Sequence, residues 1–139
     1  MRICGVELKN NEAVIAVLSH NQGLFDIHNT RVPKIAFTDQ ESEEGLKEFQ
    51  FAFEKLMADY QIEKVVILAR PLKGKFAGPG ATFKMEAALQ LSEKLDVALI
   101  KPSDIKEKMK RNPLPIAFKA TGLKPMQEQA FNTVYAYLN

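Results

Sequence analysis

The chain has 139 residues, of which 46% are hydrophobic and 26% are charged, and its formal net charge is +2. This composition suits one ordinary domain with a hydrophobic core, here taken as residues 1–139. The single cysteine, Cys4, excludes an intramolecular disulfide and a multi-cysteine zinc site. No apolar run approaches the ~18 residues that cross a bilayer, and no secretory signal opens the chain. We therefore expect a cytoplasmic protein without membrane contact.

Charge is unevenly distributed along the chain. Residues 1–63 carry 6 basic and 11 acidic side chains, whereas residues 64–124 carry 13 basic and 5 acidic ones. This asymmetry predicts that one end of the fold is electropositive and can meet phosphates or an acidic surface. The alternative is a solvated surface whose charges cluster along the chain without a partner.

The first thirty residues are predicted to form three short strands, over 2–8, 12–19 and 24–30. Asn10-Asn11 joins the first two strands, and asparagine tolerates the positive φ of tight hairpin turns. These two strands are therefore expected to be antiparallel neighbours. Residues 31–41, which include Pro33, are predicted to be a loop.

Helices and buried strands alternate in the rest of the chain. Ser42 can cap a helix that runs to residue 60, and the continuously apolar run 64–68 is typical of a strand buried on both faces. The remaining elements, predicted from apolar spacing, are a helix over 82–95, a strand over 97–100, a short basic helix over 103–111 and a last helix from Pro125 to residue 138.

This element order predicts a five-stranded mixed sheet. Three meandering strands precede two β-α crossovers, and right-handed crossovers bring the later strands back beside the first. The expected strand order is 3-2-1-4-5, with strand 2 antiparallel and the strand over 2–8 at the centre. Helices are expected on both faces, so the fold class is α/β.

Three stretches of the chain carry a resemblance to a known fold. "ICGVELKNNEAVIAVL" resembles an opening hairpin in which a glycine is followed two residues later by an acid. "VALIKPSDIKEKMKR" resembles a fifth strand with its continuation, and "LKPMQEQAFNTVYAYL" resembles a final helix. In this order they resemble the ribonuclease-H-like fold, in particular its RuvC-like branch of Holliday-junction resolvases. The chain also resembles a small, uncharacterised bacterial family of short proteins with this fold, a domain of unknown function.

The resemblance implies a divalent-metal site for phosphodiester hydrolysis, with carboxylates on strand 1, near the end of strand 4 and in the final helix. By position, Glu7 matches the strand 1 acid and Glu128 matches the helix acid. These two would be the catalytic and metal-binding residues, with magnesium or manganese as the cofactor. If the site is inactive, no cofactor is expected.

The chain departs from the family pattern at two of these positions. Glu7 stands where aspartate is usual, and Arg70 falls near the expected strand 4 acid, where a guanidinium would repel a metal ion. An unpaired buried carboxylate costs several kcal/mol, roughly 2–7 by transfer measurements. We therefore expect Glu7 to pair with Arg70 or with a lysine.

Two basic segments are candidates for binding anions or nucleic acid. The stretch "RPLKGKFAGPGATFK" combines glycines with cations ahead of a helix, an arrangement that favours anions. The candidate residues of the two segments are Arg70, Lys73, Lys75 and Lys84 in this stretch, and Lys106, Lys108, Lys110 and Arg111 in the short basic helix. The alternatives are a plain structural loop and a solvated helix face.

Three functions are compatible with these features. The first is a nucleic-acid-binding protein, for DNA or RNA, whose catalytic site is degenerate or weak. The second is a noncatalytic protein-interaction module, including a homodimer. The third is a metal-dependent nuclease that uses Glu7 and Glu128. The remaining reactive side chains, His20, His28 and Cys4, are interpreted as structural or solvent-facing.

Overall fold

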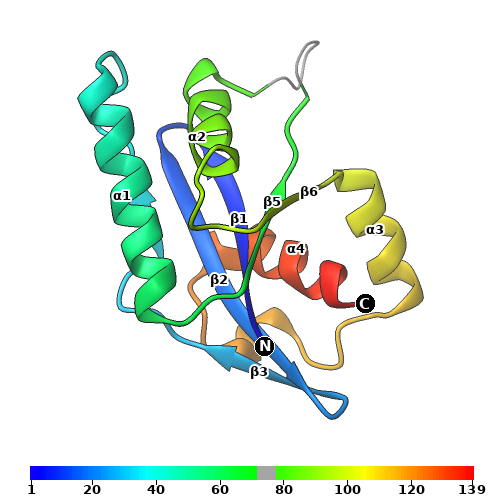
Figure 1. Cartoon of the computed structure of the whole chain (residues 1–139). Coiled ribbons are helices and arrows are strands. Elements are labelled where there is room, and N and C mark those ends of the chain that lie inside the picture. The colour runs from blue at the N-terminus through cyan, green and yellow to red at the C-terminus, as the bar shows by residue number, and fades with distance from the viewer. Residues whose placement is uncertain (72–77) are drawn as a thin grey trace.

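A mixed β-sheet with helices on both faces builds the fold, as the computed structural model of residues 1–71 and 78–139 shows (Figure 1). The strands are β1 (Arg2–Lys9), β2 (Glu12–Asn21), β3 (Leu24–His28), β4 (Lys34–Ala36), β5 (Lys64–Leu68) and β6 (Val97–Ile100). The helices are α1 (Glu43–Asp59), α2 (Gly80–Gln90), α3 (Pro102–Arg111) and α4 (Glu128–Leu138), and 3-10 turns cover Phe118–Thr121 and Pro125–Gln127. Within the described ranges, no helix is long and apolar enough to cross a membrane.

The sheet has the predicted order, β3-β2-β1-β5-β6, with β1 at its centre. β1 pairs antiparallel with β2 along its whole length and parallel with β5, and β5 pairs parallel with β6. Asn10 takes a positive φ of 55° in the turn between β1 and β2, as a tight hairpin requires. The carboxyl ends of β1, β5 and β6 therefore meet at one edge of the sheet.

The segment 31–41, predicted to be a loop, contains the short strand β4, so that part of the prediction was wrong. β4 pairs antiparallel with residues 12–14 of β2, and its central residue Ile35 is buried. The backbone amide of Ile15 donates to the carbonyl oxygen of Pro33 at 2.9 Å. Three residues are too few to show the alternating pattern that reveals a strand in a sequence.

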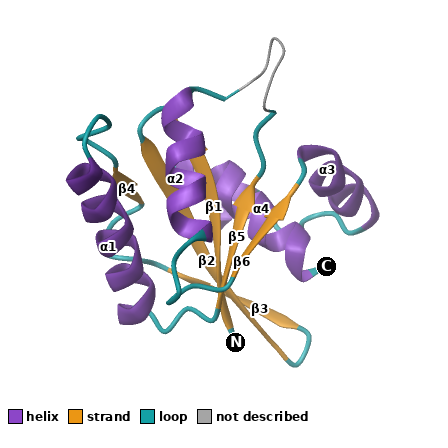
Figure 2. Cartoon of the chain, turned by 45° about the horizontal axis from the view of Figure 1, so that its top comes forward, coloured by secondary structure: helices purple, strands orange, loops and turns teal. Residues whose placement is uncertain are grey.

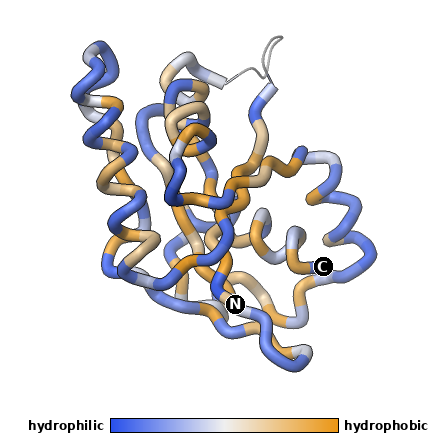
Figure 3. Tube along the Cα trace, in the orientation of Figure 1, coloured by the Kyte–Doolittle hydropathy of each residue, from blue (hydrophilic) through white to orange (hydrophobic). Residues whose placement is uncertain are grey.

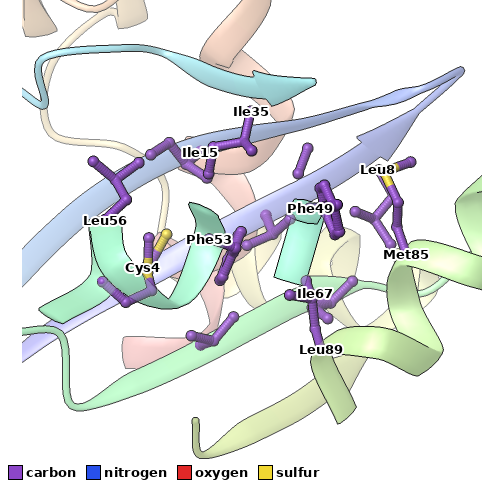
Figure 4. Packing of buried hydrophobic residues seen from close by; sticks show 14 of the residues in the cluster. Cys4, Leu8, Ile15, Ile35, Phe49, Phe53, Leu56, Ile67, Met85 and Leu89 are labelled. Atoms are coloured by element: carbon purple, nitrogen blue, oxygen red, sulfur yellow. The ribbon is translucent and has the colours of Figure 1, made fainter. Parts of the chain in front are cut away.

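α1 and α2 cover one face of the sheet and enclose the larger part of the core (Figure 4). Phe49 and Phe53 of α1 and Met85 of α2 pack against every second residue of the central strands. Cys4 belongs to this layer, and burial raises the pKa of its thiol strongly. A buried, protonated thiol agrees with the structural interpretation of Cys4.

α4 crosses the opposite face of the sheet, and α3 lies beside it (Figure 2). Ala130 and Val134 of α4 sit directly over Gly5 of β1, where a Cβ atom would lie 2.2 Å from the Ala130 carbonyl oxygen. The short apolar side chains and the glycine let this helix approach the sheet backbone closely. The alternation along β1 therefore places Ile3, Gly5 and Glu7 on the α4 side.

The largest differences between predicted and observed helix boundaries are at the end of α2 and at the start of the last helix. α2 ends at Gln90 rather than residue 95, because Ser92 turns inward and donates a hydrogen bond to Glu54 of α1. The last helix begins with a 3-10 turn, and its regular part starts at Glu128. In contrast, Ser42 caps α1 as predicted, accepting a hydrogen bond from the Gly45 amide at 2.9 Å. Figure 3 shows hydrophobic residues gathered along the central strands, with α3 hydrophilic along most of its length.

Candidate functional site

Glu7 lies near the carboxyl end of the central strand, on the α4 side, and its side chain is half-buried. Its pairing partner in β2 is Val14, and the parallel pairing with β5 ends one residue earlier, at Val6 and Ile67. Burial raises the pKa of the Glu7 carboxyl above its usual range, and the positive charges of Lys9 and Arg70 partly oppose that rise. The sheet therefore presents one partly desolvated acid at this edge.

Arg70 follows β5 by two residues and lies at the same edge of the sheet. Its Nε atom is buried and has no hydrogen-bond partner among the described residues. Gly78 packs against it, since a Cβ atom at Gly78 would lie 3.1 Å from the Arg70 Cβ and 3.3 Å from its Nε. Because Gly78 has no side chain, it leaves room for the Arg70 side chain to pack against it.

The expected ion pair between Glu7 and Arg70 is not formed. The salt bridges found within residues 1–71 and 78–139 join other residues: Arg31–Asp59, Lys34–Glu12, Lys47–Glu43, Lys64–Asp96 and Arg111–Glu107. Arg70 acts on Glu7 through its charge, without a contact between the two groups.

Glu128 is the first residue of α4 and is exposed. It precedes Ala130 by two residues, roughly 200° around the helix axis, so it points away from the contact with Gly5. Among the described residues, Lys9 and Arg70 lower the pKa of the Glu7 carboxyl by their charge, and Glu128 is not among the groups that shift it. A joint role of Glu7 and Glu128 in catalysis stays a prediction.

The donor set at this edge does not fit a two-metal centre. In the part of the chain that the structure describes, no three His, Cys, Asp or Glu side chains converge where they could share a metal ion. The groups that act on Glu7 carry positive charge, which opposes cation binding. The guanidinium of Arg70 is instead suited to an anion with hydrogen-bond acceptors.

The basic residues of α3 are presented on the surface beside this edge. Ile105 is buried and anchors α3 to the core, and the four predicted cations lie on the other faces of this helix. Lys106, Lys110 and Arg111 are exposed and Lys108 is half-buried, while Glu107 forms an ion pair with Arg111. Three of the cations lie in the last turn, where they also complement the helix dipole.

Of the remaining predicted cations, the structure places Lys84 away from this group. Lys84 lies on α2, where its Nζ donates to the carbonyl oxygen of Gln40 at 2.7 Å and so ties the helix to the segment before α1. Lys73 and Lys75 lie outside the described residues. Their predicted role in anion binding stays a prediction.

A groove joins Arg70 to the start of α3 and brings in two residues, Lys101 and Ser103, that were not predicted from the sequence. It has a volume of about 410 Å³ and is lined by Ala69, Arg70, Pro71, Lys101, Pro102 and Ser103. Lys101 follows β6 directly, next to the end of β5, and Ser103 lies two residues further, in the first turn of α3. The signal that could have found them is their position after a buried parallel strand, where open α/β sheets bind ligands.

The structure of this chain is similar to known structures along almost its whole length. It is similar to the structure of Thermus thermophilus RuvC, with a TM-score of 0.73, 12% identity, 99% of this chain and 93% of that chain. The same values hold for T. thermophilus RuvC in complex with Holliday junction substrate, except for a TM-score of 0.71. The Holliday junction resolvase of fowlpox virus matches with a TM-score of 0.54 and 9% identity, over 99% of this chain and 97% of that chain. These likenesses establish the RuvC-like, ribonuclease-H-like fold.

Sequence comparison gives one family. No curated protein matches the chain. A family model described as "Protein of unknown function (DUF3010)" matches residues 1–137, nearly the whole chain. The protein therefore belongs to the DUF3010 family and has a RuvC-like fold.

Proposed function

We propose that this protein binds nucleic acid through phosphate contacts, without a working two-metal nuclease centre. The observation that supports this most directly is the surface of α3, which presents Lys106, Lys110 and Arg111 to solvent beside the Arg70 edge of the sheet. Exposed cations grouped on one side of a fold are the usual contact for a phosphate backbone. The fold likeness to RuvC in complex with Holliday junction substrate makes branched DNA the first ligand to test.

The experiment measures binding of a four-way DNA junction, a duplex and a single strand by fluorescence anisotropy at several salt concentrations. We expect the logarithm of the binding constant to fall linearly with the logarithm of the salt concentration, as counterion release requires. The double variant Lys106→Gln/Lys110→Gln should reduce the salt slope by about 2, roughly one for each lost phosphate contact. The matched control is Lys55→Gln/Lys94→Gln, which removes the same charge from exposed positions in the layer of α1 and α2.

Two results would contradict this proposal. Equal salt slopes for the two double variants would mean that α3 makes no phosphate contact. Cleavage of the junction in manganese, lost in Glu7→Gln, would instead support the metal-dependent nuclease.

A second candidate function is protein interaction, because the structure has an apolar groove on another side. It has a volume of about 440 Å³ and lies between the β2–β3 hairpin and residues 114–116. Leu24 and Ile116 line it and are 71% and 46% exposed. Absence of oligonucleotide binding at low salt, together with concentration-dependent self-association in sedimentation that Leu24→Ser weakens, would favour this function.

A further inference from the structure

We propose that the groove at the carboxyl ends of β5 and β6 binds one internal phosphate of the nucleic-acid backbone, held by Arg70 and Lys101. This inference rests on the proposed function and names the subsite that positions the backbone. Both side chains line the groove, which has a volume of about 410 Å³. That volume lies within the range of small-ligand sites, about 300–1,000 Å³, so a phosphate fits with part of its sugar.

The groove differs in charge from a second depression nearby, which residues of α3 and Tyr137 line. Among its described lining residues, two are cationic and none is acidic. The depression on the other side of α3 also contains cations, but Asp104 and Glu107 line it as well. Glu107 there forms an ion pair with Arg111, which already neutralises part of the positive charge. The groove at Arg70 therefore has the more favourable potential for an anion.

Arg70 has a free hydrogen-bonding capacity that an anion would satisfy. Its Nε atom is buried without a hydrogen-bond partner among the described residues, and no contact with Glu7 uses its guanidinium. Because this Nε packs against Gly78, an anion in the groove would bond to the terminal N–H groups of the guanidinium, for which a phosphate oxygen is a strong acceptor. The planar guanidinium can present two parallel N–H groups to a phosphate, which a lysine cannot do.

The start of α3 adds donors to the same groove. Lys101 is the N-cap residue and makes no side-chain cap, and Pro102 has no amide hydrogen. The amides of Asp104 and Ile105 both bond to the Lys101 carbonyl oxygen, at 3.0 and 3.1 Å. Ser103 then offers its amide and hydroxyl groups at the positive end of this ten-residue helix.

Glu7 limits what the groove accepts. Its half-buried carboxyl lies close enough to Arg70 for their charges to interact. Glu7 does not line the groove but lies near the carboxyl end of β1, the strand next to β5, so a second phosphate displaced towards β1 would approach this acid. The site is therefore expected to take one phosphate beside Arg70 and not a cluster of charges. This favours a single backbone phosphate over a polyphosphate.

The first arm of the test titrates the full-length protein with inorganic phosphate and follows it by NMR. We expect the Arg70 Nε–H and Ser103 amide signals to shift in the wild type, and those shifts to be lost in Lys101→Gln. Lys101 is exposed, so this variant is expected to fold even if Arg70→Gln does not. Lys94→Gln, at an exposed position after α2, is the control and should keep the shifts.

The second arm separates a backbone phosphate from other sources of the same chemistry. Anisotropy is measured with single strands that carry a 5′-phosphate or a 5′-hydroxyl, at several salt concentrations. Lys101→Gln and Arg70→Gln should each lower the salt slope by about 0.7 on a single strand, equally for both strands. Arg70→Lys keeps the charge and loses the two-pronged contact, so its slope should stay near the wild-type value while its affinity falls.

The outcomes distinguish this inference from the proposed function. Unchanged slopes in Arg70→Gln and Lys101→Gln, with a reduced slope in Lys106→Gln/Lys110→Gln, would overturn the groove and leave nucleic-acid binding intact. An effect only on the 5′-phosphorylated strand would overturn the internal phosphate and assign the groove to strand ends. Phosphate shifts without any oligonucleotide binding would overturn both the backbone phosphate and the proposed function.

Discussion

Gly5 of β1 lies against the backbone of Ala130 in α4, so closely that a Cβ atom on Gly5 would stand 2.2 Å from the Ala130 carbonyl oxygen and 2.8 Å from the Val134 Cβ. This contact fixes the distance between α4 and the centre of the sheet. It also sets which side of α4 faces Glu7, two residues further along β1.

Gly5→Ala is expected to lower the free energy of unfolding by about 3 kcal/mol or more, because the backbone of α4 must move to relieve the clash. Urea denaturation measures the change. The control is Gly80→Ala at the start of α2, where a Cβ atom meets nothing within 4 Å. That variant should stay within about 1 kcal/mol of the wild type, on the stabilising side. Equal stabilities for the two variants would show that α4 does not pack this closely.

Gln127→Ala is expected to destabilise the fold by about 1–3 kcal/mol. Gln127 is buried, its Nε2 donates to the Ile15 carbonyl oxygen at 2.8 Å, and its Oε1 accepts from the Lys124 amide at 2.9 Å. Truncation leaves both backbone groups unpaired. The exposed Gln129 is the control, and Gln129→Ala should change stability by less than about 0.5 kcal/mol. A similar small loss in Gln127→Ala would contradict the role of this side chain in joining β2 to α4.

Glu7→Gln is expected to stabilise the protein at pH 7 and to have less effect near pH 4. Burial raises the pKa of Glu7 above its ordinary value of 4.5, so the folded chain binds the proton more tightly than the unfolded chain. Stability from this group is present below the unfolded-state pKa and is lost as the pH rises through the folded-state pKa. Glutamine keeps the shape without the charge and avoids that loss.

Urea denaturation of Glu7→Gln and wild type at both pH values measures this difference. Glu63→Gln removes the same charge at an exposed position just before β5 and serves as the control. A Glu7→Gln variant that is less stable than the wild type at pH 7 would show that the ionised carboxylate has a stabilising partner.

Millimolar magnesium or manganese chloride is expected to leave the Tm unchanged, relative to sodium chloride of equal ionic strength. A cation that binds only the folded state would raise the Tm by mass action. The charges of Lys9 and Arg70 beside Glu7 oppose such binding. Differential scanning fluorimetry makes the comparison, and a manganese-dependent rise abolished by Glu7→Gln would reinstate the metal site.

The sequence was most informative where burial repeats along an element. The apolar runs of β1 and β2 and the helical spacing in α1 predicted the elements and their order, because a short apolar run indicates a strand buried on both faces and helical spacing indicates the buried face of a helix. β4 could not be predicted in this way because three residues carry no period. The early end of α2 depends on the contact between Ser92 and Glu54, which lie 38 positions apart.

The candidate site was predicted only in part. Its position at the carboxyl end of the central strand followed from the element order, and so did the presence of an acid and an arginine there. The separation of Glu7 from Arg70 did not follow, because it depends on the three-dimensional packing of the Arg70 side chain, which lies beside Gly78. Lys101 was not predicted as a site residue, because it comes close to Arg70 only through the parallel pairing of β5 with β6.

The sequence by itself determined the fold class, the strand order and the basic character of α3, since these depend on local periodicity, crossover handedness and composition. Tertiary structure alone decided which charged groups meet. Arg70 stands apart from Glu7 and shares a groove with Lys101, 31 positions later in the chain, because β5 and β6 pair in parallel and end at the same edge. Which side chains lie close together depends on distances across the sheet, and the residue pattern within one element does not contain those distances.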